Sequence, residues 1–184
     1  MPNEVEMAHQ RFGFLEILER HAEAMRAEFE TLPSSLFIPM PSTEMYQGVW
    51  TACIVKLEQY GEEFEGLDVE ANRRRCPVAA SVMDQIPGAI VGAYLALAPG
   101  ASLRIHTDIR DDDVIRCHLG LRLAPHEHAY WKEGTARPMD IRMPHAARNN
   151  GDVPRITFLL DVRMPFVIPT GSVPPWNPDL AQAT

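Results

Sequence analysis

Short segments rich in β-forming residues, separated by turn residues and not by helices, dominate the second half of this chain. Together with one earlier segment, they cover residues 49–57, 89–98, 102–108, 114–124 and 155–164. Strands that follow one another through short turns pair antiparallel, whereas parallel pairing needs a long crossover between the strands. The pattern therefore predicts a mainly β fold, built as an antiparallel sandwich or barrel.

The N-terminal part has a helical pattern instead. Apolar side chains recur every three or four residues over residues 5–31, which predicts one amphipathic helix that packs against its own domain rather than a partner or membrane. These side chains are Phe12, Leu15, Leu18, Ala22, Met25 and Phe29. Proline ends the pattern at Pro33, and residues 33–48 are expected to form a loop. A further short helix is expected to begin with Pro77 in its first turn.

Length and composition fit a single globular domain of 184 residues. Apolar residues make up 46% of the chain and charged residues 23%, which excludes a disordered chain and a coiled-coil rod. We expect a helix and loop over residues 1–48, a β core over residues 49–164 and an extended, proline-rich tail over residues 165–184.

The charge balance argues against nucleic acid as a partner. The 17 basic and 25 acidic residues give a formal net charge of −8, while nucleic-acid surfaces attract a surplus of cations. No apolar run approaches the roughly 20 residues of a membrane span, and the first residues lack the pattern of a signal peptide. Cys53, Cys76 and Cys117 form no Cys-x-x-Cys motif. Because their number is odd and no export signal is present, we expect reduced thiols in a cytoplasmic protein.

One pair of polar residues suggests a metal site. His106 and Asp108 lie two positions apart at the end of a predicted strand, so their side chains point to the same face. With His145 they would form a set of two histidines and one carboxylate. Such a set binds non-haem Fe(II) on one triangular face and leaves positions open for a cosubstrate and O₂. We interpret these three residues as candidate metal ligands and catalytic residues.

Basic residues nearby could hold an anion. Arg155 begins the last predicted strand, ten residues after His145, and could bind the far carboxylate of a dicarboxylic cosubstrate through two parallel hydrogen bonds. Arg116 and His118 also lie two positions apart on one strand. A charged side chain on an apolar strand needs a partner, and either a small anion or an internal acidic residue would serve.

Other polar and aromatic motifs carry weaker signals. The His-Glu-His turn at residues 126–128 is interpreted as a solvated loop rather than a metal site. The acidic run Asp111–Asp113 lacks the glycine and spacing of a calcium loop and is also expected to be solvated. Trp50 and Trp131 could stack on a substrate, but we expect them in the core.

The order of motifs over residues 76–164 is specific enough to compare with known families. The motifs are Cys76-Pro77, Ile86-Pro87, the Pro99-Gly100 turn, the R-x-H-L-G-L strand from Arg116 to Leu121, the W-x-x-G turn at Trp131, the step from His145 to Arg155, and Leu160-Asp161-Val162. This order resembles the aspartyl/asparaginyl β-hydroxylase family of Fe(II)/2-oxoglutarate-dependent dioxygenases. The resemblance implies a double-stranded β-helix, the jelly roll of cupin-like proteins.

The resemblance also implies roles for individual residues. His106 and His145 match the family's two iron-binding histidines. Asp108 stands where the animal aspartyl/asparaginyl hydroxylases have glycine. Bacterial lipid A hydroxylases of the family are similar to this chain in having His-x-Asp, so a complete facial triad is expected. Arg137 and Arg142 depart from the family pattern; they could hold an anionic substrate, but we expect them to face solvent.

The implied chemistry uses Fe(II), 2-oxoglutarate and O₂, with 2-oxoglutarate held by Arg116, His118 and Arg155. Hydroxylation of an unactivated C–H bond would give succinate and CO₂ as coproducts. We expect the β-carbon of an amino acid, free or peptidyl and Asp/Asn-like, as the target. The alternatives are hydroxylation of an acyl chain and a non-catalytic jelly-roll protein that binds a small acid or metal. Substrate, stereochemistry and oligomeric state do not follow from the sequence.

Overall fold

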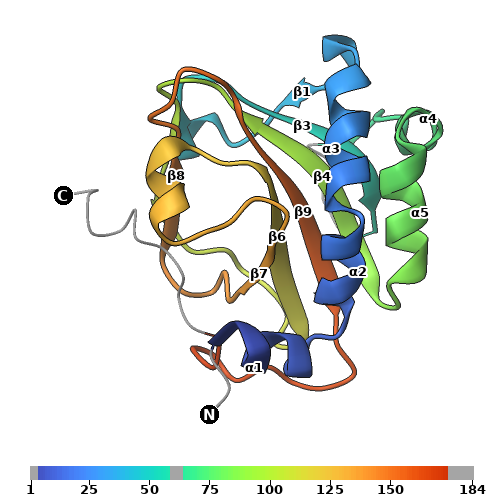
Figure 1. Cartoon of the computed structure of the whole chain (residues 1–184), viewed down its shortest axis with the longest axis vertical. Helices are drawn as coiled ribbons and strands as arrows, with labels where there is room; N and C mark the ends of the chain where they lie inside the picture. Colours follow the sequence, from blue (N-terminus) through green and yellow to red (C-terminus); the bar gives the residue numbers. More distant parts are fainter. Residues whose placement is uncertain (1–3, 59–63, 174–184) are drawn as a thin grey trace.

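The structure is a computed structural model that describes residues 4–58 and 64–173 (Figure 1). Its strands are β1 Ile38–Pro39, β2 Tyr46–Gln47, β3 Trp50–Leu57, β4 Ala89–Leu97, β5 Ser102–His106, β6 Val114–Arg122, β7 Ala136–Met139, β8 His145–Arg148 and β9 Arg155–Arg163. Its helices are α1 Glu4–Arg11, α2 Phe14–Arg20, α3 Ala22–Thr31, α4 Val69–Arg75 and α5 Pro77–Gln85. The predicted long strands and the helix begun by Pro77 agree with these bounds to within two residues.

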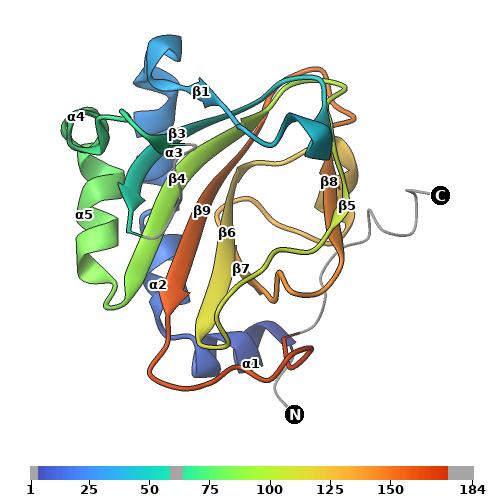
Figure 2. The ribbon, with the colours of Figure 1, turned by 180° about the vertical axis from the view of Figure 1, so that it is seen from behind.

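Two antiparallel sheets form the framework. One has six strands in the order β1-β3-β4-β9-β6-β7, and the other has three in the order β2-β5-β8. The chain passes repeatedly from one sheet to the other, so strands distant in sequence become neighbours, as β4 and β9 do (Figures 1 and 2). The fold is therefore mainly β, a jelly roll with a helical N-terminal part, as the sequence predicted.

The N-terminal apolar stripe is buried as expected, with Leu15, Leu18 and Met25 fully inaccessible to solvent. The prediction of one continuous helix over residues 5–31 is wrong, because the chain forms three short helices, α1 to α3. The first break includes Gly13, a residue that costs about 1 kcal/mol relative to alanine inside a helix.

The second break lies at His21 and has a local cause. In a continuous helix, the carbonyl oxygen of Ile17 would accept the main-chain N–H of His21. Here that oxygen lies 2.8 Å from the Nδ1 atom of the His21 ring, and the main-chain N–H donates to Leu18 instead. The side chain thus takes the place of a helical hydrogen bond, and α2 ends before His21.

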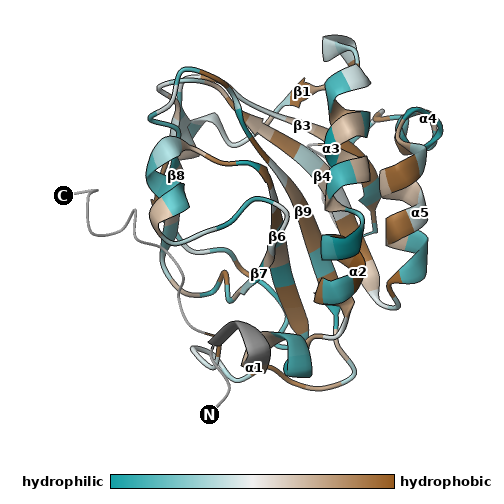
Figure 3. Cartoon of the chain, viewed as in Figure 1, coloured by the Kyte–Doolittle hydropathy of each residue, from teal (hydrophilic) through white to brown (hydrophobic). Residues whose placement is uncertain are grey.

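The main hydrophobic core lies between the helices and the outer face of the six-stranded sheet. Tyr94, Phe158 and Leu119 are cross-strand partners on that face and are fully buried. The Tyr94 and Phe158 rings meet edge to face at 5.1 Å. Figure 3 shows hydrophobic residues recurring along the central strands and on α5, which packs against β3 and β4. The opposite face of this sheet is thereby left to face the smaller sheet.

Glu28 joins three elements inside this core. Its carboxylate is nearly buried and accepts hydrogen bonds from the main-chain N–H groups of Val78 and Ala79, at 2.6 and 3.1 Å. The Tyr94 hydroxyl donates to the same carboxylate at 2.7 Å. Glu28 of α3 therefore caps the first turn of α5 and holds it to β4.

Replacing Glu28 with alanine should lower the free energy of unfolding by about 2–3 kcal/mol, because the main-chain donors of Val78 and Ala79 lose their side-chain acceptor and the Tyr94 hydroxyl is left with the Met25 carbonyl at 3.1 Å. Urea unfolding followed by circular dichroism measures the change. The control is Glu23→Ala, at an exposed position of the same helix, which should stay within about 0.5 kcal/mol of the parent. Similar losses of unfolding free energy in both variants would show that α3 is sensitive to substitution in general. They would contradict a specific role for Glu28.

The remaining segments are less regular. The expected loop over residues 33–48 also contains β1 and β2, each two residues long. The sequence predicted none of α4, β7 and β8. Residues 165–173 contain neither helix nor strand, and the rest of the expected tail lies outside the described residues. No helix in the described ranges is long and apolar enough to cross a membrane.

Candidate metal and cosubstrate site

A cavity of about 610 Å³ lies between the inner faces of the two sheets. Its walls come from β3, β4, β6, β7 and β9 on one side and from β5 and β8 on the other. All six candidate site residues line it: His106, Asp108, Arg116, His118, His145 and Arg155. The fold thus brings together residues that are up to 49 positions apart in the sequence.

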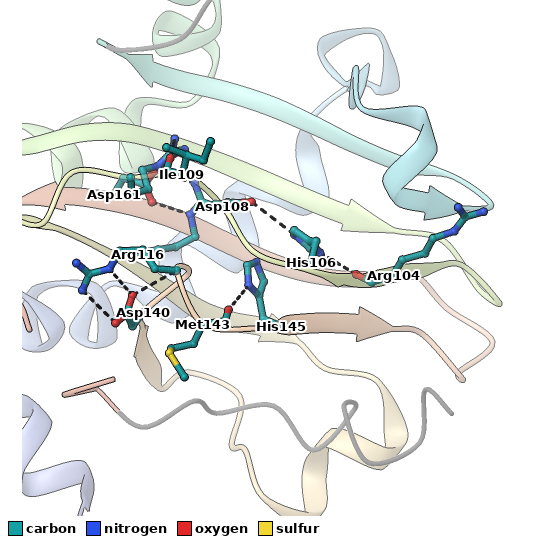
Figure 4. Close-up of polar contacts among 11 residues, drawn as sticks. Arg104, His106, Asp108, Ile109, Arg116, Asp140, Met143, His145 and Asp161 are labelled. Carbon is teal, nitrogen blue, oxygen red and sulfur yellow. Dashed lines mark hydrogen bonds and ion pairs between the residues drawn. The ribbon is translucent and has the colours of Figure 1, made fainter. Parts of the chain in front are cut away.

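The three candidate metal ligands lie at one end of the smaller sheet (Figure 4). His106 and His145 are direct partners across β5 and β8, and their ring centroids are 4.1 Å apart. Asp108 follows β5, and its main-chain N–H donates to the carbonyl of Ile141 at 2.8 Å. One ligand atom from each of the three side chains lies within 4.8 Å of the others, which is close enough for one metal ion.

Each histidine ring is held by a main-chain contact at Nδ1, the nitrogen that faces away from the candidate metal position. Nδ1 of His106 lies 2.7 Å from the carbonyl oxygen of Arg104, and Nδ1 of His145 lies 3.0 Å from that of Met143. A ring that donates from Nδ1 carries its lone pair on Nε2, the arrangement that metal-binding histidines need. Burial also lowers the pKa of His145, which keeps this ring neutral. The side chains therefore fit a divalent metal ion.

The carboxylate of the triad is held by an ion-pair chain. Arg116 donates from Nη1 to Oδ2 of Asp108 at 2.8 Å, and from Nε and Nη2 to Asp161 at 2.7 and 2.8 Å. Asp161 is completely buried; burial alone would raise its pKa, but the Arg116 guanidinium outweighs this effect and lowers it. Of the two partners considered for Arg116, the structure thus provides the internal acidic one, and this arginine orients Asp108.

Arg155 has an acidic partner that the sequence did not indicate. The expectation of a solvated His-Glu-His loop is wrong for Glu127, which is only 2% exposed. Its carboxylate accepts Nε and Nη2 of Arg155 at 2.8 and 2.9 Å, and also the main-chain N–H of Ala124. The guanidinium lies over the Trp131 ring, 5.7 Å from its centroid. Since the pair uses Nε and Nη2, a ligand carboxylate would approach the Nη1 group of Arg155.

His118 lies between the two arginines on the cavity wall. Burial and the nearby charges of Arg116 and Arg155 lower its pKa well below the usual value. The ring is therefore neutral and can donate or accept one hydrogen bond without adding charge. Its Nδ1 lies 3.4 Å from the hydroxyl oxygen of Thr157 on β9.

The expectation that Arg137 and Arg142 face solvent is also wrong. Arg137 lines the cavity, donates to the carbonyl of Tyr130 and lies over the Trp131 ring. Arg142 binds the buried carboxylate of Asp140 through Nε and Nη2, at 2.8 and 3.0 Å. Both are partly buried because their charges are matched by acceptors that lie close in space.

The acidic loop and the tryptophans differ partly from expectation. Asp111–Asp113 is tied down by ion pairs with Arg163 and Arg142 and is not simply solvated. Trp131 is buried, as predicted, but it also lines the cavity. Trp50 is only partly buried and lies on the cavity wall as well.

Two solved structures show modest similarity to this chain. AviO1 from Streptomyces viridochromogenes Tue57 is 17% identical, with a TM-score of 0.43 over 85% of this chain and 87% of that one. A prolyl-4-hydroxylase from Pseudomonas putida is 14% identical, with a TM-score of 0.41 over 81% of this chain and 87% of that one.

Sequence comparison gives the family. Aspartate beta-hydroxylase domain-containing protein 2 is 28% identical over 190 residues in Mus musculus and 29% over 194 residues in Homo sapiens. Each match covers 92% of this chain, which spans about half the length of these relatives (49% and 46%). The family model for aspartyl/asparaginyl beta-hydroxylase matches residues 19–165. The chain therefore belongs to the aspartyl/asparaginyl β-hydroxylase family.

Proposed function

We propose that this protein is a non-haem Fe(II)- and 2-oxoglutarate-dependent dioxygenase that hydroxylates an unactivated C–H bond, with succinate and CO₂ as coproducts. The convergence of His106, Asp108 and His145 within 4.8 Å is the observation that carries the proposal. Membership of a hydroxylase family supports it. We also propose a cytoplasmic location, with the three cysteines as free thiols.

In this proposal the triad would hold the iron. Bound iron, with its cosubstrate and O₂, supplies the oxidising chemistry that no side chain can supply. The protein's own contribution is orientation. Main-chain carbonyls fix the two imidazole rings, and Arg116 fixes Asp108 so that the carboxylate keeps one oxygen for the metal. Because Asp161 holds Arg116 in place, this arrangement exists before any ligand binds.

Arg155 and His118 would hold the cosubstrate. The Arg155 guanidinium would pair with the far carboxylate of 2-oxoglutarate through Nη1, while Glu127 keeps its plane fixed. The neutral His118 would give one further hydrogen bond without repelling Arg155. Both residues come from the same wall of the cavity, on the neighbouring strands β9 and β6.

Arg155→Ala should raise the concentration of 2-oxoglutarate needed for half-maximal turnover by about 10–100-fold, the scale of a lost charge-assisted pair. Succinate formation at varied 2-oxoglutarate measures this. The control is Arg163→Ala, at the other end of β9 and paired with the exposed acidic loop, which should leave the requirement unchanged. An unchanged requirement in Arg155→Ala would assign the cosubstrate to another cation.

The proposal is tested most directly without any substrate. Purified protein is titrated anaerobically with Fe(II) and 2-oxoglutarate, and the visible spectrum is followed. A keto acid that chelates bound Fe(II) gives a metal-to-ligand charge-transfer band, which should appear here and be absent in His106→Ala. Folded protein that binds Fe(II) but gives no band would contradict the proposal and favour the non-catalytic binding protein.

The site of hydroxylation has two candidates, of which the β-carbon of an Asp/Asn-like residue is supported by the family alone. Hydroxylation of an acyl chain is the second candidate. It is favoured by the apolar side chains that line much of the cavity, with residues such as Ile54, Val91 and Leu95 on its wall.

A further inference from the structure

The register of the six-stranded sheet shows how polarity changes across the cavity wall. One row of cross-strand partners contains, from β3 to β7, Ile54, Ala93, Leu159, His118 and Arg137. All five residues line the cavity. The row is aliphatic on β3, β4 and β9 and becomes polar on β6 and β7.

The adjacent row changes in the same direction. It contains Leu57, Val91, Asp161, Arg116 and Met139, again from β3 to β7. Here the charged pair Asp161–Arg116 lies on β9 and β6, while β3 and β4 contribute aliphatic side chains. The inner face therefore has a polar strip on β6 and β7, beside the candidate metal site, and an apolar strip on β3 and β4 that extends to Leu159 on β9.

The cavity extends over the apolar strip. Further apolar residues enclose it there, namely Met40, Met45, Trp50, Phe64, Leu97 and Leu103. An aspartyl or asparaginyl side chain placed on this strip would lose its hydrogen bonds to water without replacement, which is unfavourable. Ile109, which follows the triad residue Asp108, is 96% exposed and adds apolar surface to the lining. The lining thus suits a ligand with a substantial apolar part.

The charged residues that line the cavity indicate which kind of polar group the ligand carries at the end opposite its apolar part. Four arginines and two carboxylates line the cavity in the described residues, and the buried Asp161 compensates one more arginine. Among these described residues the formal charges sum to +1, although the whole chain carries a formal charge of −8. A divalent metal and a dicarboxylate cosubstrate would cancel each other. The excess therefore favours an anionic ligand over a cationic one.

On the basis of the proposed function, we propose that the substrate is a small anionic amphiphile whose apolar chain lies on the inner face of β3 and β4. Neighbouring strands are about 4.8 Å apart, so the strip from Leu159 on β9 to Ile54 on β3 spans about 10 Å, close to the length of an extended chain of about eight carbons. The head group would remain near the arginines, and the chain would extend from it along the apolar strip.

Isothermal calorimetry on metal-free protein tests this independently of the proposed reaction, since the strip needs no iron. The probes are octanoate and decanoate, below their micellar concentrations, with L-aspartate, L-asparagine and decylamine for comparison. Octanoate or decanoate should bind at least about tenfold more tightly than each of the other three. The proposal is overturned if L-aspartate or L-asparagine binds as tightly as the chain acids, or if decylamine does.

Two alanines of β4 give a matched pair of variants. Ala93 faces the cavity, whereas Ala96 packs towards the helices on the opposite face. Ala93→Leu should weaken decanoate binding at least about tenfold, and Ala96→Leu should leave it unchanged. Equal affinities for decanoate in the parent and in folded Ala93→Leu would overturn the proposed location of the chain.

Ile54→Ala tests this location a second time. The smaller side chain should lengthen the preferred chain by about two carbons, and an unchanged preferred chain length would contradict the location.

Discussion

Replacing either His106 or His145 with alanine is expected to abolish the iron-dependent conversion of 2-oxoglutarate to succinate. Each histidine supplies one of three candidate ligand atoms, and the other two cannot close the triangular face alone. Both rings are already oriented by main-chain carbonyls, so little else in the structure depends on their Nε2 atoms. The loss should therefore be one of metal binding and not of folding.

Two measurements separate these causes: iron retained after anaerobic loading and desalting, and the thermal unfolding midpoint. The histidine variants should lose iron while the midpoint of the metal-free protein changes little. His128→Ala, at an exposed position near the buried Glu127, is the control and should retain both iron and turnover. Turnover retained in either His106→Ala or His145→Ala would contradict the assignment of these histidines as metal ligands.

Unchanged iron affinity in Asp108→Ala would show that this carboxylate is not a metal ligand.

Asp161→Ala should destabilise the protein by about 3–5 kcal/mol, the largest effect on stability that we expect from one substitution. Asp161 is fully buried and receives two hydrogen bonds from Arg116, which is itself only 9% exposed. Removal of the carboxylate takes away two of the guanidinium's hydrogen bonds, while the one to Asp108 at 2.8 Å remains. Stability is lost because the Arg116 guanidinium stays buried away from water without the carboxylate that neutralised most of its charge.

A bidentate pair at the surface provides the comparison. Asp84 binds Arg73 through both carboxylate oxygens at 2.8 Å, but its side chain is 61% exposed. Asp84→Ala should cost only about 0–1 kcal/mol, because water replaces the lost partner. Chemical denaturation measures both changes. Equal, small effects for the two variants would mean that water reaches the Arg116 site and that the pair is not a fixed support for Asp108.

The sequence predicted the parts of the fold that depend on neighbouring residues. Strand segments were found because turn residues and apolar runs are local signals, and the motif spacing from His106 to Arg155 was sufficient to propose the site. The break at His21 could not be predicted, since it depends on where one ring nitrogen points. The Glu127–Arg155 pair joins residues 28 positions apart and needs the folded chain to be seen.

The apolar strip was beyond sequence reasoning for a related reason. Ile54, Ala93 and Leu159 each look like ordinary core residues in their own segments. Only the register of three strands shows that they form one continuous surface beside the polar strip. The sequence could therefore keep an amino acid and an acyl chain as alternatives, but could not choose between them.

The division of β4 into two faces separates two properties that often conflict during evolution. Tyr94 and its neighbours on the helical side hold the fold together, while Ala93 and Leu95, on either side of Tyr94 in the chain, meet the cavity. Odd and even positions of one strand thus have different roles, one set in the cavity and the other in the core. Substitutions at the cavity positions can change the substrate, and such changes often lower stability. The residues on the helical side can stay unchanged and keep the protein folded.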